Sequence, residues 1–553
     1  MTGSQRIAAT ARPATAAVRE HREEWGQPVF SVGRFGAVAD GRNKDTGAIQ
    51  AAIDAAHAAG GGVAHLPPGT YLSGGIELRS RVTLHLEAGA VLLGSTDLAD
   101  YPPHEGPPAD CDAGQRHLVF ARGATDIAIT GAGTIDGQGP AFWEPSGRPP
   151  TPPDRFWADV VTHNWKPVGN NDRPSPMVEL AECRNVRIEG VTLRNSPGWT
   201  LRPIACDTVL IRGIVIRNPI DGINTDGIDP TACQNVFIAD CDIETGDDAI
   251  CLKSENPYGD LRVTRNVVVT NCVLSCCCNA FKLGTATRGG FEDITFTNSV
   301  IYNRDVPLNE RVISGIAIEM VDGGWVDGVT VSDIRMRNTR TPVFIRLGNR
   351  GWGQPDPVPG RLRRVRISGI DATGAILTSS ITGLAEQPVE DVVLSGIRID
   401  TDEGGRREWV ERDIPEEIAE YPEARMFGRL PAYGLYVRHA RGIRLSGTEI
   451  RSTVLDPRPL LVADDVVGLS VDTLDGTGPG PGTSLLDLRD TRDAFLSGSR
   501  APHGTDVYLK VSGVRSADIA LAGNELSRAT SAVETTGGAA PDSVISDGNP
   551  VGR

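Results

Sequence analysis

Hydrophobic residues recur in short alternating runs along most of the chain. From about residue 60 onward, β-branched residues alternate with polar positions, and Gly or Asn separates one run from the next. Residues 185–193 have the sequence Asn-Val-Arg-Ile-Glu-Gly-Val-Thr-Leu, and similar phrases return at 208–216, 235–238, 266–269 and 364–367. A period of two is typical of a strand that buries one face. The pattern therefore predicts many short strands.

The spacing of these phrases indicates how the strands are arranged. Successive phrases begin roughly 20–35 residues apart, which is the range of solenoid repeats. No helical pattern of about 10–15 residues separates them, and this argues against βαβ units. Strands stacked coil upon coil, about 4.8 Å apart, would bury Val and Ile in a common interior. We predict an all-β fold, a right-handed parallel β-helix.

Three segments interrupt the repeat. Residues 45–59 have the pattern of a short Ala-rich helix, which ends at three glycines and would cap the open end of the solenoid. Residues 137–176 are rich in proline and aromatic residues, whereas 403–430 are charged with a helical pattern at 409–419; we expect both to be inserted loops. The predicted organisation is an N-terminal tail (1–27), a cap with the first coils (28–100), a β-helical catalytic domain (101–545) and a C-terminal tail (546–553).

Two phrases rich in aspartate stand out from the repeat. Residues 224–229 are Asn-Thr-Asp-Gly-Ile-Asp, and residues 246–250 are Gly-Asp-Asp-Ala-Ile. Asp226 and Asp247 are 21 residues apart, about one coil, so stacking would place them side by side with Asp248. Crowded carboxylates resist simultaneous ionisation, so one pKa should rise. A protonated acid beside an ionised base is the pair that glycosidic cleavage needs.

A structural interpretation of these aspartates also exists. Asn and Asp are common in turns because their side chains bond the local backbone. For Asp229 we prefer that interpretation and predict a turn residue. For Asp226, Asp247 and Asp248, three carboxylates in register and flanked by Gly favour chemistry.

Composition and charge exclude several classes of partner. The 553 residues include 55 Lys and Arg against 71 Asp and Glu, a formal net charge of −16. Net acidity argues against a nucleic-acid partner. No uncharged apolar run of about 18 residues occurs, so we expect no membrane span. The sequence contains no CxxC pair or Cys/His cluster with zinc spacing, and we predict neither a metal nor another cofactor. The spacing pattern makes no prediction of oligomeric state.

The first residues bear on cellular location. Residues 1–20 hold Ala and Thr but no leucine-rich apolar core of the kind found in signal peptides. We therefore predict a cytoplasmic protein. If a leader has been removed ahead of this sequence, the protein would be secreted.

With these motifs the chain resembles glycoside hydrolase family 28, the polygalacturonase family. The similar phrases lie at 35–41 (Phe-Gly-Ala-Val-Ala-Asp-Gly), 131–139, 195–199 (Asn-Ser-Pro-Gly-Trp), 224–226, 246–248 and 421–434. The resemblance implies a parallel β-helix and hydrolysis with inversion at the anomeric carbon. It implies Asp247 as general acid, with Asp226 and Asp248 orienting and deprotonating the attacking water.

Two departures from the family pattern bear on the substrate. Asn279 stands where the family has the His of a Gly-His-Gly phrase; an amide can only hydrogen-bond, so we predict that Asn279 binds substrate. Ala317 and Glu319 stand where the family has the Arg and Lys that hold the galacturonate carboxylate. An anion in place of two cations would repel a uronate. We therefore predict cleavage at a neutral sugar, or at an unusual uronate, of a plant cell-wall-type glycan, with Glu319 accepting hydrogen bonds from sugar hydroxyls.

Four more side chains are predicted to bind substrate. Lys282 would either restore a positive charge in the groove or pair with Glu319. Arg346 would lie near the groove or pair with a carboxylate of a coil. Trp165 would stack on a sugar or attach its loop to the scaffold, and Asn224 completes the Asn-Thr-Asp phrase. The two inserted loops would close one end of the groove, which predicts exo action on an oligosaccharide or polysaccharide.

Other functions stay open at this point. An exo-polygalacturonase or a rhamnogalacturonan hydrolase would have the same aspartates. A polysaccharide lyase would need calcium and a Lys or Arg base, and the order of the motifs fits hydrolysis better. A non-catalytic glycan-binding β-helix would not need three aspartates in register.

Overall fold

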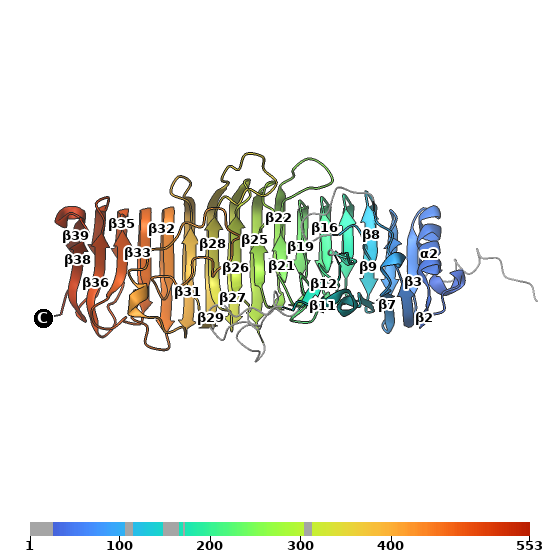
Figure 1. Cartoon of the computed structure of the whole chain (residues 1–553), viewed down its shortest axis with the longest axis horizontal. Coiled ribbons are helices and arrows are strands. Elements are labelled where there is room, and N and C mark those ends of the chain that lie inside the picture. Colours follow the sequence, from blue (N-terminus) through green and yellow to red (C-terminus); the bar gives the residue numbers. More distant parts are fainter. Residues whose placement is uncertain (1–25, 105–113, 148–164, 170–171, 304–311, 553) are drawn as a thin grey trace, which may run out of the picture.

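The protein is an elongated parallel β-helix, which runs from the blue N-terminal end to the red C-terminal end of Figure 1. The computed structural model describes residues 26–104, 114–147, 165–169, 172–303 and 312–552, so most of the predicted N-terminal tail lies outside the described residues. Neighbouring strands of the solenoid pair in parallel from one coil to the next. The predicted right-handed parallel β-helix and all-β class are confirmed.

Each coil contributes strands to three ladders, which form the faces of the solenoid. The first ladder contains β1 (Val29–Ser31), β3 (Gly62–Leu66), β6 (Val82–Leu86), β9 (Thr125–Gly131), β14 (Arg184–Glu189), β17 (Asp207–Arg212), β19 (Gln234–Ala239), β22 (Thr264–Thr270), β25 (Phe291–Tyr302), β27 (Trp325–Arg337), β29 (Arg361–Ala375), β31 (Val389–Thr401), β32 (Leu435–Ser452), β33 (Leu461–Gly476), β35 (Arg492–Ser497), β37 (Ala517–Ala522) and β39 (Val544–Asp547).

The second ladder is formed by shorter strands and ends where β23 pairs with the last part of β25. Its strands are β2 (Asp40–Lys44), β4 (Gly69–Ser73), β7 (Ala90–Gly94), β10 (Thr134–Asp136), β15 (Thr192–Arg194), β18 (Val215–Arg217), β20 (Asp242–Thr245) and β23 (Val273–Cys276). The first-ladder strands β25, β27, β29, β31, β32 and β33 are long enough to continue from the first face into this one.

The third ladder carries the functional residues described below. Its strands are β5 (Ile76–Glu77), β8 (Val119–Arg122), β13 (Val178–Ala181), β16 (Leu201–Ile204), β21 (Ile250–Leu252), β24 (Asn279–Leu283), β26 (Ser314–Met320), β28 (Thr341–Leu347), β30 (Ser379–Thr382), the first parts of β32 and β33, β34 (Ser484–Arg489), β36 (Thr505–Ser512) and β38 (Ala529–Thr536). Between β16 and β21, Ile228 continues the ladder through single bridges to Leu201 and Ile250.

The alternating pattern fills the interior of the solenoid. In β14, Val186 and Ile188 are buried whereas Arg187 between them is exposed. Val186 is in register with Val209 of β17, and Val209 with Val236 of β19, so inward residues stack in columns. Full burial of such side chains contributes about 1.5–3 kcal/mol each, so the stacked inward residues stabilise the solenoid along its length.

The Asn and Asp residues that separate the runs form the corners of the coils. Asn235 and Asn266 have φ of 57° and 56°, in the left-handed region that Asn tolerates better than most residues. The Asn266 side chain donates to Asn235 Oδ1 over 2.9 Å, and Asn235 donates to Asp207 Oδ1 over 3.1 Å. These corner contacts explain why the sequence repeats a polar residue ahead of each apolar run.

The predicted cap is present as α2 (Thr46–Ala58), the α-helix in the described part of the chain. It lies across the N-terminal end of the solenoid in Figure 1 and buries Ile49, Ala52, Ile53 and Ala56. The described residues also include short 3-10 turns: η1 (Val32–Phe35), η2 (Leu98–Asp100), η3 (Gly139–Phe142), η5 (Arg407–Trp409) and η6 (Pro541–Ser543). None of the described helices has the length and apolarity that a membrane span requires.

The two predicted loops differ from the repeat in different ways. Within 137–176, β11 (Trp143–Pro145) and β12 (Trp165–Pro167) form a small antiparallel pair, and residues 148–164 lie outside the described residues. The helical pattern at 409–419 is wrong, because 403–430 contains only the 3-10 turn η5 and otherwise irregular structure.

The apolar residues of the 403–430 segment pack against the solenoid instead of forming a helix. Ile414, Ala424 and Phe427 join one buried cluster with Ala317 of β26 and Phe344 of β28. As a result, β24, β26 and β28 are buried on both faces. The segment therefore covers the third ladder beside the carboxylates.

Candidate active site

The three aspartates come from two successive coils at the edge of the third ladder. Asp226 precedes the bridging residue Ile228, and Asp247 and Asp248 precede β21. The amide of Gly227 donates to the Asp248 carbonyl over 2.9 Å, so Asp226 and Asp248 lie on adjacent rungs. Parallel stacking thus brings the two phrases together as their spacing predicts.

Two adjoining cavities open beside these carboxyls, with volumes of about 1020 Å³ and about 240 Å³. The residues that line both cavities are Asn224, Asp247, Asp248, Lys282 and Tyr421. The smaller cavity is also lined by Asp226, Trp199, Lys253, Thr285, Ala286, Arg350 and Trp352. The aspartates therefore face a space in which a sugar can bind.

Asp248 is held as an ionised carboxylate. Its Oδ1 accepts hydrogen bonds from Asn279 N and Nδ2 over 2.9 and 2.8 Å, and its Oδ2 lies 3.0 Å from Lys282 Nζ. Burial by itself raises the pKa of Asp248. The Lys282 and Lys253 ammonium groups and the Asn279 N–H lower this pKa by more than burial raises it, so the pKa of Asp248 lies below its ordinary value. Asp248 is therefore suited to act as a base.

The other two aspartates have the opposite tendency. Burial and the neighbouring Asp248 carboxylate raise the pKa of Asp247 to about 7. Burial and the Asp247 carboxyl raise the pKa of Asp226 well above its usual range, and Asp226 Oδ1 has no hydrogen-bond partner among the described residues. Near neutral pH the cavity thus contains a proton donor beside an ionised carboxylate, the arrangement of general acid–base catalysis.

Four of the predicted substrate-binding residues line a cavity. Asn279 borders the larger cavity, and both its backbone N–H and its side-chain amide donate hydrogen bonds to Asp248 Oδ1. Lys282 satisfies both of its alternatives, because it lines both cavities and its Nζ lies 3.6 Å from Glu319 Oε2. Asn224 lines both cavities, and its Oδ1 accepts from Arg173 Nη2 over 3.1 Å. Trp165 lines the larger cavity and donates from Nε1 to Asp221 Oδ2 over 2.8 Å.

Glu319 and Arg346 lie away from the lining of both cavities, in contrast to their predicted contact with substrate. Glu319 is 1% exposed; burial raises its pKa to about 7, and Lys282 lies against it. Arg346, also 1% exposed, donates to the carbonyls of Gly383, Glu416 and Glu417 and so attaches the 403–430 segment to β28. Because the 403–430 segment covers the outer face of the third ladder, both side chains are buried under it and contact neighbours of the cavity instead of lining it.

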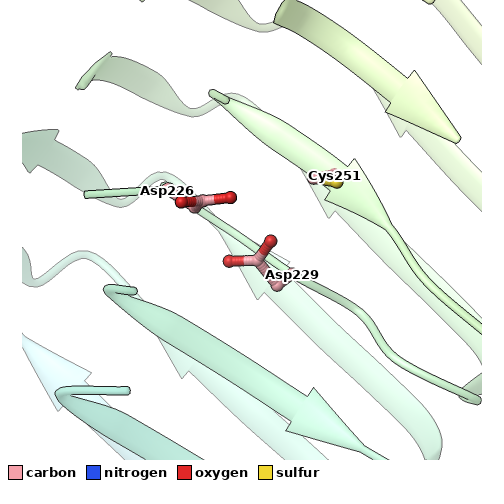
Figure 2. A group of neighbouring side chains, drawn as sticks. All are labelled: Asp226, Asp229 and Cys251. Carbon is pink, nitrogen blue, oxygen red and sulfur yellow. The ribbon is translucent and has the colours of Figure 1, made fainter. Parts of the chain in front are cut away.

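The interpretation of Asp229 as a turn residue is wrong. Neither carboxyl oxygen of Asp229 has a hydrogen-bond partner among the described residues, although the residue is fully buried. Figure 2 shows its carboxyl group next to that of Asp226, with Cys251 on the neighbouring strand β21. One oxygen of each Asp and the Cys251 sulfur lie within 4.8 Å of one another. Burial raises the pKa of Asp229 to about 7.

Such a group has the donor atoms of a metal site, but a cation already lies against it. Lys253 Nζ donates to Cys251 Sγ over 3.2 Å and lies 4.0 Å from Asp229 Oδ1. A metal ion bound to these atoms would meet the ammonium group at short range. The residues therefore fit a lysine–carboxyl cluster better than a metal centre.

Seven residues that line the smaller cavity were not predicted as site residues from the sequence: Trp199, Lys253, Thr285, Ala286, Arg350, Trp352 and Tyr421. Lys253 had a weak signal, since it follows the aspartate pair by five positions, but alternation does not fix its side. Tyr421 begins the 421–434 phrase that resembles the family, but nothing in that phrase indicates a contact with Lys282, which lies 139 residues away and donates a hydrogen bond to the Tyr421 hydroxyl over 3.3 Å.

Comparison with known protein families identifies the family of this chain. The model of the glycosyl hydrolases family 28 matches residues 72–415, and a rhamnogalacturonase A/epimerase, pectate lyase-like model matches residues 29–91. The chain belongs to glycoside hydrolase family 28. As a family 28 member it is a glycosidase that hydrolyses O-glycosyl bonds.

The individual relatives of this family 28 chain also support its assignment as a glycosidase. It is 30% identical over 384 residues to a probable polygalacturonase of Vitis vinifera, across 66% of this chain and 73% of the relative. It is 27% identical to an exo-poly-alpha-D-galacturonosidase of Dickeya chrysanthemi, across 64% of each chain. The structure of a hyperthermoactive exopolygalacturonase from Thermotoga maritima superposes with a TM-score of 0.56 at 25% identity, across 70% of this chain and 92% of that chain. These relatives give no support to the predicted neutral sugar.

Proposed function

We propose that this family 28 chain is an inverting, exo-acting hydrolase that releases a terminal galacturonate from pectic chains. Asp247 is the general acid, Asp248 deprotonates the attacking water, and Asp226, whose pKa is raised well above its usual range, orients that water. The main support for the proposal is that the pKa values of two neighbouring residues, Asp247 and Asp248, are shifted in opposite directions. Asp247 is raised to about 7, and Asp248 is lowered, in carboxyls that line the same cavities.

The proposed step balances as follows. Asp247 gives its proton to the glycosidic oxygen as the bond from that oxygen to the anomeric carbon breaks. The water oxygen bonds to the anomeric carbon from the opposite side, and its proton passes to the ionised carboxylate. The released sugar has the inverted anomeric configuration, and solvent exchange restores both carboxyls.

The proposed sugar differs from the neutral sugar that positions 317 and 319 predict. That prediction needs the Glu319 charge to face the substrate, whereas Glu319 lies outside both linings and against Lys282. The smaller cavity itself is lined by three cations, Lys253, Lys282 and Arg350. The relatives named as polygalacturonases support the same choice.

Two segments outside the repeat support exo action. The larger cavity is bordered on one side by Trp165, Lys166 and Pro167 of β12. It is bordered on another side by the 403–430 segment, through residues that include Tyr421 and Met426. We infer that these two segments narrow the access to the cavity, so that a chain end would bind more readily than the middle of a polymer.

Product analysis on polygalacturonate tests this proposal. We expect monosaccharide as the first product, with the inverted configuration in NMR spectra recorded before mutarotation. Asp247→Asn should lower kcat by about 10²–10⁴-fold with folding intact. Asp54→Asn, an exposed position on α2, is the matched control and should leave kcat unchanged. A ladder of intermediate oligomers at early times, retention of configuration, or no hydrolysis of any pectic polymer would contradict the proposal.

A further inference from the structure

Lys253 presents a buried ammonium group to the smaller cavity with few partners. The residue is 7% exposed, and its Nζ donates to Cys251 Sγ over 3.2 Å. An ammonium group has three N–H donors, and a thiol is a weak acceptor. Asp229 Oδ1, at 4.0 Å, is too distant for a hydrogen bond. Within the described residues, two donors of Lys253 therefore stay available to a ligand.

The surroundings of Lys253 favour an anion as that ligand. The Trp199 ring covers one side of the ammonium, with its centroid 4.7 Å from Nζ. Lys282 and Arg350 also line the cavity. Arg350 binds Asp322 over 2.8 Å, and Lys282 binds Asp248 over 3.0 Å, so both of these cations already have a carboxylate. Lys253 has no carboxylate within hydrogen-bond distance, and a buried charge is stabilised most by a charged acceptor.

The position of the cavity says which molecule would bring this anion. Asp226, Asp247 and Asp248 line the same 240 Å³ space as Lys253. A sugar that fills this space is therefore the sugar whose bond is cleaved. A carboxylate on that sugar would reach Lys253 while its anomeric carbon lies near the aspartates.

We propose that Lys253 binds the carboxylate of the terminal uronate and determines specificity for a uronate over the neutral sugar of the same configuration. Lys253 thereby supplies a positive charge that the sequence lacks at Ala317 and Glu319. The inference rests on the proposed function for the identity of the sugar. It goes beyond that function because it assigns recognition of the sugar carboxylate to Lys253. This residue directly follows β21 and forms a single parallel bridge with Thr231 of the preceding coil.

Binding of two monosaccharides tests this assignment without any turnover. D-galacturonate and D-galactose differ only at C6, which is a carboxylate in the first and a hydroxymethyl group in the second. We expect NMR titration of the full chain to show galacturonate binding about 10- to 100-fold more tightly than galactose, the range of one hydrogen bond to a charged group. Lys253→Met should remove this preference and leave galactose binding unchanged. Lys44→Met, an exposed lysine paired with Asp100, has the same change in net charge and should keep the preference.

A second variant guards against misfolding. Lys253→Met leaves Asp229 buried without its cation, so the double variant Lys253→Met/Asp229→Asn removes both charges together. We expect the same loss of preference in the double variant, with a melting temperature close to that of wild type. A loss of affinity that is equal for both sugars would mean a structural role and would overturn the assignment.

The outcomes separate this inference from the proposed function. If the wild type hydrolyses polygalacturonate and Lys253→Met keeps the preference for galacturonate, the inference is wrong and the proposed function stands. If the wild type hydrolyses no pectic polymer but prefers galacturonate through Lys253, the proposed function is wrong and the inference stands. A wild type that binds neither sugar, or binds both equally, overturns the inference.

Discussion

The Lys282 ammonium lies between two carboxyl groups, 3.0 Å from Asp248 Oδ2 and 3.6 Å from Glu319 Oε2. One cation thus connects the aspartate that faces the cavity with a carboxyl that is buried two coils further along. Lys282 keeps Asp248 ionised, and its own pKa is raised well above the ordinary value by these carboxyls despite burial. The charge of Asp248, the base in the proposed mechanism, therefore depends on a residue that belongs to the next rung.

The pH dependence of turnover follows from these pKa displacements. The proposed mechanism needs Asp247 protonated and Asp248 ionised. The pKa of Asp247 is raised to about 7, so kcat/KM should fall as pH increases through about 7. The pKa of Asp248 is lowered from its ordinary value of 3.8, so the acidic limb should lie below that value. A pH–rate profile on polygalacturonate measures both limbs. An alkaline limb at pH 5 or below would contradict the assignment of Asp247 as acid.

Removal of the Lys282 charge should shift the acidic limb of this pH–rate profile more than the alkaline limb. In Lys282→Met, Asp248 loses its nearest cation, so its pKa should rise and the acidic limb should shift to higher pH. We expect a shift of about one to two pH units and a lower kcat. Lys44→Met, which removes an exposed lysine paired with Asp100 in the first coils, is the control and should keep the wild-type profile. An unchanged acidic limb in Lys282→Met would mean that Lys282 does not govern Asp248.

Arg346 should matter through the 403–430 segment. Arg346→Met removes the donors that hold the carbonyls of Gly383, Glu416 and Glu417, and it also removes the contact with the Phe427 ring. We expect the segment to loosen, with a stability loss of about 3 kcal/mol, faster proteolytic cleavage within 403–430 and a higher KM. Arg335→Met, an exposed arginine paired with Asp371, should cost less than about 1 kcal/mol. Equal proteolysis of the two variants would show that Arg346 does not secure the segment.

Glu319 should make the fold less stable as pH rises. The pKa of its carboxyl is raised from 4.5 to about 7 in the folded chain, so the folded state binds more protons than the unfolded state between these values. Stability from this group is therefore complete below about pH 4.5 and is lost as pH rises through about 7. Glu319→Gln cannot ionise, so its stability relative to wild type should increase by about 2 kcal/mol between pH 5 and pH 7. Calorimetric unfolding at both pH values measures this. A stability difference that is the same at both pH values would contradict the prediction.

The gathering of the aspartates could be predicted because the repeat itself produces it. A spacing of one coil between Asp226 and Asp247 places them on adjacent rungs whatever the details of the loops. The same reasoning failed for Asp229, since a preference for turns says nothing about whether local backbone donors are in reach. In the folded chain Asp229 faces Asp226, and no donor reaches its oxygens among the described residues.

The solenoid, its N-terminal cap and the register that aligns three carboxyls could be predicted from the sequence, because a period of two and a repeat of one coil are local properties of the chain. The side chains that complete the cavities could not be predicted in this way, because they depend on long-range packing. Tyr421 reaches Lys282 across 139 residues, Glu319 is buried beneath the segment that carries Tyr421, and Lys253 faces the cavity at an irregular bridge. These positions depend on how an inserted segment packs on the outer face of the sheet, and that packing has no periodic signal in the sequence.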